Sequence, residues 1–120
     1  MVLVHIFLLR LLSGLPENQG YNSFQELKEA IGSAGNGKHW HYIVKQSQIG
    51  KSSYTSQQIN NTSNIIAIDS AVHAKIRGYY NTKSFDFINC LSVRNWLAGQ
   101  NFDVQYEFGI NVLRQYRVIK

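Results

Sequence analysis

Cysteine and long apolar runs are both scarce in this chain of 120 residues. Its single cysteine, Cys90, excludes an internal disulfide framework and a cysteine-based zinc cage, and it leaves the redox compartment open. The most apolar run, residues 2–12, is far shorter than the roughly 20 residues that a membrane-spanning helix requires, so we expect no membrane span. We expect residues 1–20 to form an apolar segment that packs on the domain, or the stub of a longer chain, with a degenerate export signal as the alternative.

Acidic residues are few as well, with 7 Asp and Glu against 12 Lys and Arg, which gives a formal net charge of +5. This excess suits a polyanionic partner, although small basic proteins without such a partner are common. A hydrophobic share of 44% and a charged share of 16% are typical of a globular chain and argue against disorder. We therefore expect one domain over residues 21–120.

The pattern of apolar residues predicts an α+β fold. Residues 39–46 and 64–68 are rich in aromatic or β-branched side chains and predict two strands, separated by a polar loop over residues 47–63. Ser23 and Glu26 form a capping-box pattern that predicts a helix over residues 24–31, ended by a glycine. Three further helices are expected, one from residues 69–70 to about residue 80, one over residues 91–98, and one from after residues 101–103 to about Arg117.

Histidines mark the most informative part of the pattern. His39 and His41 lie two apart on the first predicted strand, so their side chains share a face. His73 lies early in the helix that follows the second strand, and Asn64 lies where the polar loop enters that strand. This order is the layout of a ββα-metal nuclease site, in which two strands and a helix hold one divalent ion against a phosphodiester. We therefore take His41, His73 and Asn64 as candidate metal ligands, with Asn64 alternatively pinning the loop that holds the general base.

Several separated blocks of sequence also resemble a known family in one order. The blocks are WHYIVKQ at 40–46, INNTSNII at 59–66, VHAKIRGYY at 72–80, VRNWL at 93–97, QNF at 100–102 and QYEFGINVL at 105–113. They resemble the HNH/endonuclease VII superfamily, and within it the nuclease domains at the C-termini of bacterial polymorphic toxins of the Rhs, wall-associated protein A and LXG types. The resemblance covers residues 21 to about 117.

This resemblance implies a domain with a ββα-metal centre and additional packed helices. It implies hydrolysis of DNA or RNA phosphodiester bonds with one divalent ion, Mg²⁺, Mn²⁺ or Zn²⁺, held by His41 and His73. It also implies a cognate immunity protein as a partner, and secretion or delivery into a target bacterial cytoplasm as part of a larger toxin.

Three positions depart from the family pattern. Tyr42 occupies the position of the general base, Lys45 that of an acidic residue, and Asn60 that of a histidine. A tyrosine with a pKa near ~10 is a poor base at neutral pH, and a lysine repels a cation unless it contacts a phosphate instead. His39, which shares the face of His41, is an alternative base or metal ligand. A second water molecule is a further alternative for the base. Two hypotheses follow, namely a working nuclease with Tyr42, Asn64 and His39 as candidate catalytic residues, and a non-catalytic relic that binds nucleic acid or an immunity protein.

Basic residues surround this candidate site in the sequence. They are Lys45, Lys51, Lys75, Arg77 and Lys83. We expect Lys45, Lys75 and Arg77 to bind the nucleic-acid backbone, with a merely solvated face as the alternative. A third and different class of function is a small structural zinc domain that uses His39, His41 and His73.

Overall fold

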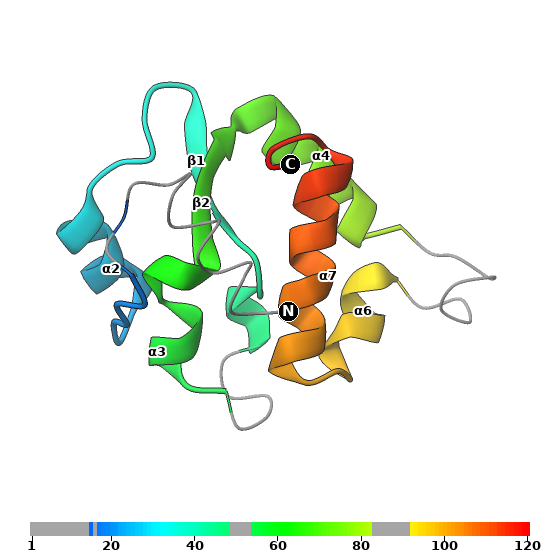
Figure 1. Ribbon diagram of the computed structural model, residues 1–120, viewed down its shortest axis with the longest axis horizontal. Coiled ribbons are helices and arrows are strands. Elements are labelled where there is room, and N and C mark those ends of the chain that lie inside the picture. The colour runs from blue at the N-terminus through cyan, green and yellow to red at the C-terminus, as the bar shows by residue number, and fades with distance from the viewer. Residues whose placement is uncertain (1–14, 16, 49–53, 83–91) are drawn as a thin grey trace.

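The computed structural model describes residues 15, 17–48, 54–82 and 92–120 (Figure 1). The first 14 residues of the expected apolar segment, together with Lys51, Lys83 and Cys90, lie outside the described residues. The elements, in chain order, are α2 (Phe24–Ile31), β1 (Lys38–Tyr42), η1 (Gln46–Gln48), α3 (Ser56–Ile59), η2 (Thr62–Asn64), β2 (Ile65–Asp69), α4 (Ser70–Tyr80), α6 (Val93–Ala98) and α7 (Phe102–Gln115). The predicted α+β class is confirmed.

The two strands form an antiparallel sheet at the centre of the molecule. His39 pairs with Ile68 and His41 with Ile66, so alternate residues of β1 point toward α4 and away from it. Figure 1 shows α2 and α3 on one side of this sheet and α4, α6 and α7 on the other. Because α4 begins directly at the end of β2, the helix folds back onto the strands with no intervening loop.

Strand β1 is shorter than the predicted strand over residues 39–46, because its pairing ends at Tyr42. The next two residues leave the ladder and bond to Asn64 instead, with Ile43 donating its amide to the Asn64 carbonyl at 2.8 Å and Val44 donating to the Asn64 side chain at 2.8 Å. Ile43 and Val44 are nevertheless buried, which explains the strand-like pattern of this stretch.

Local capping signals define two of the helices that precede the second strand. The Ser23 hydroxyl accepts from the Glu26 amide, so the predicted start of α2 is confirmed, and Gly32 ends the helix with φ at 79°. The prediction of a polar loop over residues 47–63 was wrong at residues 56–59, which form a helix. Thr55 and Gln58 form a complete capping box there and begin the short helix α3.

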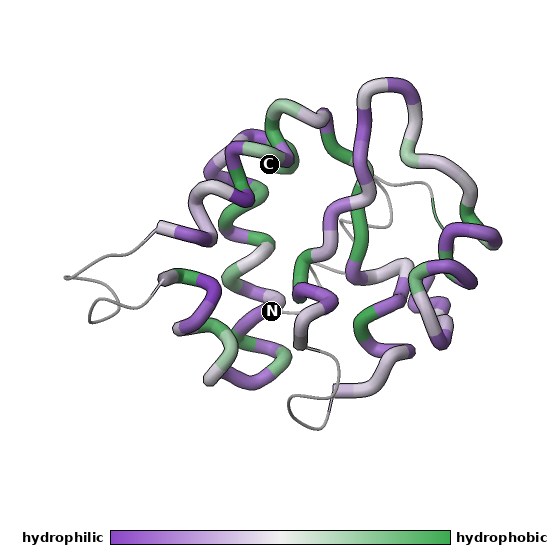
Figure 2. Tube along the Cα trace, turned by 180° about the vertical axis from the view of Figure 1, so that it is seen from behind, coloured by the Kyte–Doolittle hydropathy of each residue, from purple (hydrophilic) through white to green (hydrophobic). Residues whose placement is uncertain are grey.

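The hydrophobic core is built from residues of both strands and of helices on both sides of the sheet, namely α2 and α3 on one side and α4, α6 and α7 on the other. Figure 2 shows hydrophobic residues along β2 and along α7. Gly109 of α7 lies so close to the chain after β1 that a Cβ there would be 2.7 Å from the Ile43 carbonyl oxygen. This close approach fixes α7 against the segment that leads from β1 into the candidate site.

Candidate functional site

The structure brings three histidines from two elements together. His39 and His41 come from one face of β1, and His73 comes from the fourth position of α4. The rings of His39 and His73 stack with centroids 5.2 Å apart and an interplanar angle of 20°. The rings of His41 and His73 meet edge to face with centroids 5.7 Å apart. The period-two spacing on β1 and the direct passage from β2 into α4 therefore produce one imidazole cluster.

Burial favours the neutral form of the two inner imidazoles, His41 and His73. His41 is fully buried, and neither of its ring nitrogens has a hydrogen-bond partner among the described residues. Loss of hydration lowers the pKa of His41 well below its ordinary value, and the positive charges of Lys45 and His73 lower it further. Burial, followed by Lys45, His39 and Arg77, lowers the pKa of His73 as well. Neutral imidazole is the form that ligates a metal ion.

Two imidazole side chains, those of His41 and His73, are available as ligands for a divalent ion. His41 offers two buried ring nitrogens without partners and His73 offers its Nδ1, so the two side chains fit the role of imidazole ligands. Among the described residues, no group of three or more His, Cys, Asp or Glu side chains is arranged to hold a metal ion. A bound ion would therefore keep most of its coordination positions open for water and phosphate oxygens.

Tyr42 and Asn60, two of the departures from the family pattern, bond to each other. The Tyr42 hydroxyl donates to Asn60 Oδ1 at 2.5 Å, and both side chains are buried. Burial raises the pKa of the Tyr42 hydroxyl far above its ordinary value. Tyr42 is thus a hydrogen-bonded core tyrosine in this structure, and its proton is committed to Asn60.

The Asn64 side chain connects two stretches of backbone. Its Oδ1 accepts from the Val44 amide at 2.8 Å, and its Nδ2 donates to the carbonyls of Val44 and Ile59 at 2.9 and 3.0 Å. The side chain is almost fully buried. Of the two roles that the sequence left open for Asn64, this geometry is that of pinning the segment after β1, from which Lys45 enters the site.

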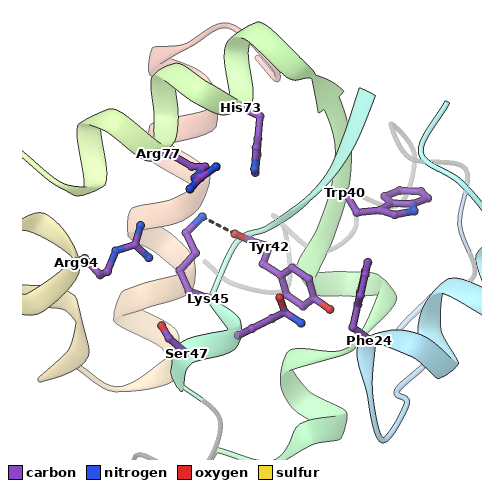
Figure 3. Close-up of a pocket in the computed structure, with 9 residues that line it drawn as sticks. Phe24, Trp40, Tyr42, Lys45, Ser47, His73, Arg77 and Arg94 are labelled. Carbon is purple, nitrogen blue, oxygen red and sulfur yellow. Dashed lines mark hydrogen bonds between the residues drawn. The ribbon is translucent and has the colours of Figure 1, made fainter. Parts of the chain in front are cut away.

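A cavity of about 310 Å³ opens beside the histidines (Figure 3). Its lining combines aromatic and basic side chains, and none of the described residues that line it is acidic. The lining residues are Phe24, Trp40, Tyr42, Lys45, Gln46, Ser47, His73, Arg77 and Arg94. Figure 3 shows Lys45, Arg77 and Arg94 on one side of Tyr42, and Phe24 and Trp40 on the other.

Lys45 and Arg94 both lie near the ring of Tyr80. Lys45 Nζ lies 4.4 Å from the centroid of the Tyr80 ring and donates to the Tyr42 carbonyl at 2.8 Å. The Arg94 guanidinium lies 6.0 Å from the same ring, and its Nε donates to Asn81 Oδ1 at 3.3 Å. Burial, followed by the charge of Arg94, lowers the pKa of Lys45 to about 7. The Arg94 guanidinium and the protonated fraction of Lys45, with no carboxylate among the described residues that line the cavity, create a positive potential that an anion relieves.

The structure separates the predicted basic residues. Arg77 lines the cavity together with Lys45, whereas Lys75 is exposed on α4 and lies outside the lining. Sequence reasoning missed Arg94 as a site residue, although it lies within the VRNWL block, and it also missed Phe24 and Trp40. Arg94 comes from α6, and nothing local in the sequence indicates that this helix packs against α4.

Comparison with protein-family models, with curated proteins and with solved structures finds no match to this chain. In the part of the chain that the structure describes, no helix has both the length and the apolar character of a membrane span. The histidine cluster and the basic cavity beside it are therefore the features of this chain that bear on function.

Proposed function

We propose that this chain is a metal-dependent endonuclease domain of HNH/endonuclease VII type, similar to the nuclease domains of bacterial polymorphic toxins. One observation carries the proposal, namely that two antiparallel strands and the helix directly after them join His39, His41 and His73 beside a cavity whose lining is basic. Phosphodiester hydrolysis needs both parts, because the phosphate must be held by positive charge and the attacking water must be activated.

In this proposal His41 and His73 would hold a divalent ion, and when bound it would supply positive charge to the phosphate and the leaving oxygen. Arg77 and Arg94 hold the phosphate oxygens, because guanidinium groups match phosphate geometry. His39 is exposed on the outer side of the cluster and stacks on His73, so it is the candidate to take a proton from water. Tyr42 has no part in proton transfer here, since its hydroxyl is bonded to Asn60.

Lys45 is compatible with a cation nearby. A fully charged lysine beside the two imidazoles would oppose metal binding. Its lowered pKa of about 7 means that a large fraction of Lys45 is uncharged at neutral pH. The unprotonated fraction weakens the repulsion, and the protonated fraction is available to a phosphate oxygen.

The test is a cleavage assay on plasmid DNA and total tRNA with Mg²⁺, Mn²⁺, Zn²⁺ or EDTA. We expect metal-dependent cutting by the chain as given, and loss of cutting in His73→Ala. The matched control is Lys120→Ala, which removes an exposed side chain far from β1 in the sequence. Absence of cutting in every metal, by protein with the circular dichroism of a folded chain, would rule out the nuclease proposal.

A second candidate is a non-catalytic relic of the same fold that binds nucleic acid or an immunity protein. The bond between Tyr42 and Asn60 favours it, because it replaces the expected general base with a buried pair. The relic predicts binding of nucleic acid without cleavage, and cleavage gained in the variant Tyr42→His. The working nuclease predicts that the chain as given already cuts.

A further inference from the structure

The aromatic side of the cavity is a rigid wall. Trp40 is half-buried, and its indole Nε1 donates to the Gly32 carbonyl at 2.9 Å, which fixes the ring on the end of α2. Phe24, the first residue of α2, is also half-buried, and its ring lies 6.0 Å from that of Tyr42. Both rings pack only at the edge of the hydrophobic core, so they keep surface free toward the cavity.

The cations lie opposite this wall. In Figure 3, Arg77, Arg94 and Lys45 approach the cavity from α4, α6 and the segment after β1, across Tyr42 from Trp40 and Phe24. A ligand that satisfies both sides must carry a flat apolar group at one end and a negative charge at the other. A nucleotide has this construction, since its base has two π-faces and its phosphate carries the charge.

The size of the cavity restricts the nucleic acid further. A volume of about 310 Å³ lies at the small end of the range for ligand sites and suits one nucleotide. A base inside a duplex is stacked between its neighbours and cannot lie against a protein ring without leaving the stack. Proteins that bind single strands combine a basic groove with aromatic side chains, as this cavity does.

We propose that the cavity is a nucleotide subsite that takes one unpaired nucleotide of a single-stranded nucleic acid, with its base against Trp40 and Phe24 and its phosphate against Arg77 and Arg94. This inference rests on the proposed function, because it concerns the same site, and it specifies single-stranded nucleic acid as the substrate class. An unpaired nucleotide held here would present its phosphate to His73, which lines the same cavity.

Fluorescence gives the most direct test, because the chain has two tryptophans and Trp96→Phe leaves Trp40 as the only one. Trp96 packs against Phe108, away from the cavity, so this variant keeps the site intact. In EDTA, we expect oligonucleotides dT12 and rU12 to quench Trp40 fluorescence. Inorganic phosphate, which has no base, should leave it unchanged. The two oligonucleotides distinguish a DNA preference from an RNA preference.

Affinity measurements by fluorescence anisotropy complete the test. We expect Trp40→Leu to weaken binding of the preferred single strand about 5- to 150-fold, which corresponds to one lost stacking interaction. Phe24→Leu, which leaves the Trp40 hydrogen bond intact, should weaken it in the same direction, and Trp96→Phe should bind as the parent does. Equal affinity for a duplex of the same length, together with unchanged binding by both cavity variants, would overturn the subsite. Cleavage is measured separately, so quenching without cutting refutes only the nuclease proposal, and cutting without a single-strand preference refutes only the subsite.

Discussion

At the scale of single residues, Tyr42 and Asn60 form a structural hydrogen-bonded pair where the sequence predicted a general base. The two residues are 18 apart in the sequence, and each satisfies a polar group of the other inside the core. A buried polar group costs free energy unless it is hydrogen-bonded. The pair is therefore a unit, and the properties of either residue depend on the other.

Removing the Tyr42 hydroxyl should destabilise the fold. Tyr42→Phe leaves Asn60 Oδ1 buried without its donor, so we expect the free energy of unfolding to fall by about 1–3 kcal/mol. Urea denaturation followed by circular dichroism measures this change, with an unchanged m-value as the sign of an intact fold. The matched control is Tyr21→Phe, because the Tyr21 hydroxyl has no hydrogen bond in the described part of the chain. Equal stability of the two variants would contradict the role of the pair.

His41 makes stability depend on pH. Its pKa is lowered in the folded protein, whereas the unfolded chain has an ordinary pKa near ~6.5, so the unfolded state binds more protons below that pH. Stability is complete with respect to this group above about pH 6.5 and falls as the pH drops toward the folded pKa, by at most about 1.4 kcal/mol per pH unit. Lys45 acts with the same sign between its folded pKa of about 7 and its ordinary value of 10.5, because its unfolded form again holds the extra proton.

The measurement is a set of urea titrations from pH 5 to pH 8 in EDTA. We expect the parent to lose stability on acidification and His41→Gln to show a shallower loss. His39→Gln serves as the control, since His39 lies on the same strand but is exposed. An identical slope for the parent and His41→Gln would show that burial of this imidazole does not govern the acid response.

At the scale of elements, α7 lies very close to the segment after β1 at Gly109. A glycine inside a helix normally costs about 1 kcal/mol relative to alanine, so a Gly→Ala change there should stabilise the protein. At Gly109 the added Cβ would lie 2.7 Å from both the carbonyl oxygen and Cγ2 of Ile43. Steric overlap therefore outweighs helix propensity at this position.

Two alanine substitutions separate these effects. We expect Gly109→Ala to lower the free energy of unfolding by about 1–3 kcal/mol, because the two elements must move apart. Gly78→Ala in α4 is the matched control, since a Cβ there has nothing within 4 Å, and it should raise stability by up to about 1 kcal/mol. Thermal and urea unfolding measure both. Stabilisation by Gly109→Ala would contradict the close approach of α7.

The elements also show which parts of the fold and of the site could be predicted from the sequence. Helices α2 and α7 follow from caps and periodicity, and α4, α6 and strand β2 from periodicity, all of which act over a few residues. The expected cap of α4 at Asp69 was wrong, because this side chain makes no capping hydrogen bond. The early end of β1 depends on Asn64, which is 20 residues from Val44, so a local pattern could not predict it. The histidine cluster was predictable because its residues lie on a strand and on the helix that directly follows the sheet. Phe24 and Arg94 in the cavity lining were not predictable, since α2 and α6 contribute them from distant parts of the sequence.

At the scale of the whole molecule, the chain carries an excess of positive charge, and part of it lines the cavity. The net charge of +5 is spread over a small domain with extents of 41 × 31 × 26 Å. In the proposed complex only some of these charges would contact a bound phosphate, and those contacts would release counterions on binding. The salt dependence of binding therefore reports which cations take part, independently of the total charge.

Arg94→Gln and Lys75→Gln form a matched pair for this test, because each lowers the net charge by one. Arg94 lines the cavity, whereas Lys75 is exposed outside it. For binding of dT12 in EDTA, the logarithm of the association constant should fall linearly with the logarithm of salt concentration, with a slope of about −0.7 per phosphate neutralised. We expect Arg94→Gln to reduce the magnitude of this slope by about 0.7, and Lys75→Gln to leave it within error of the parent. Equal changes in the two variants would mean that the domain attracts nucleic acid through its overall charge, and that the cavity does not select where the phosphate lies.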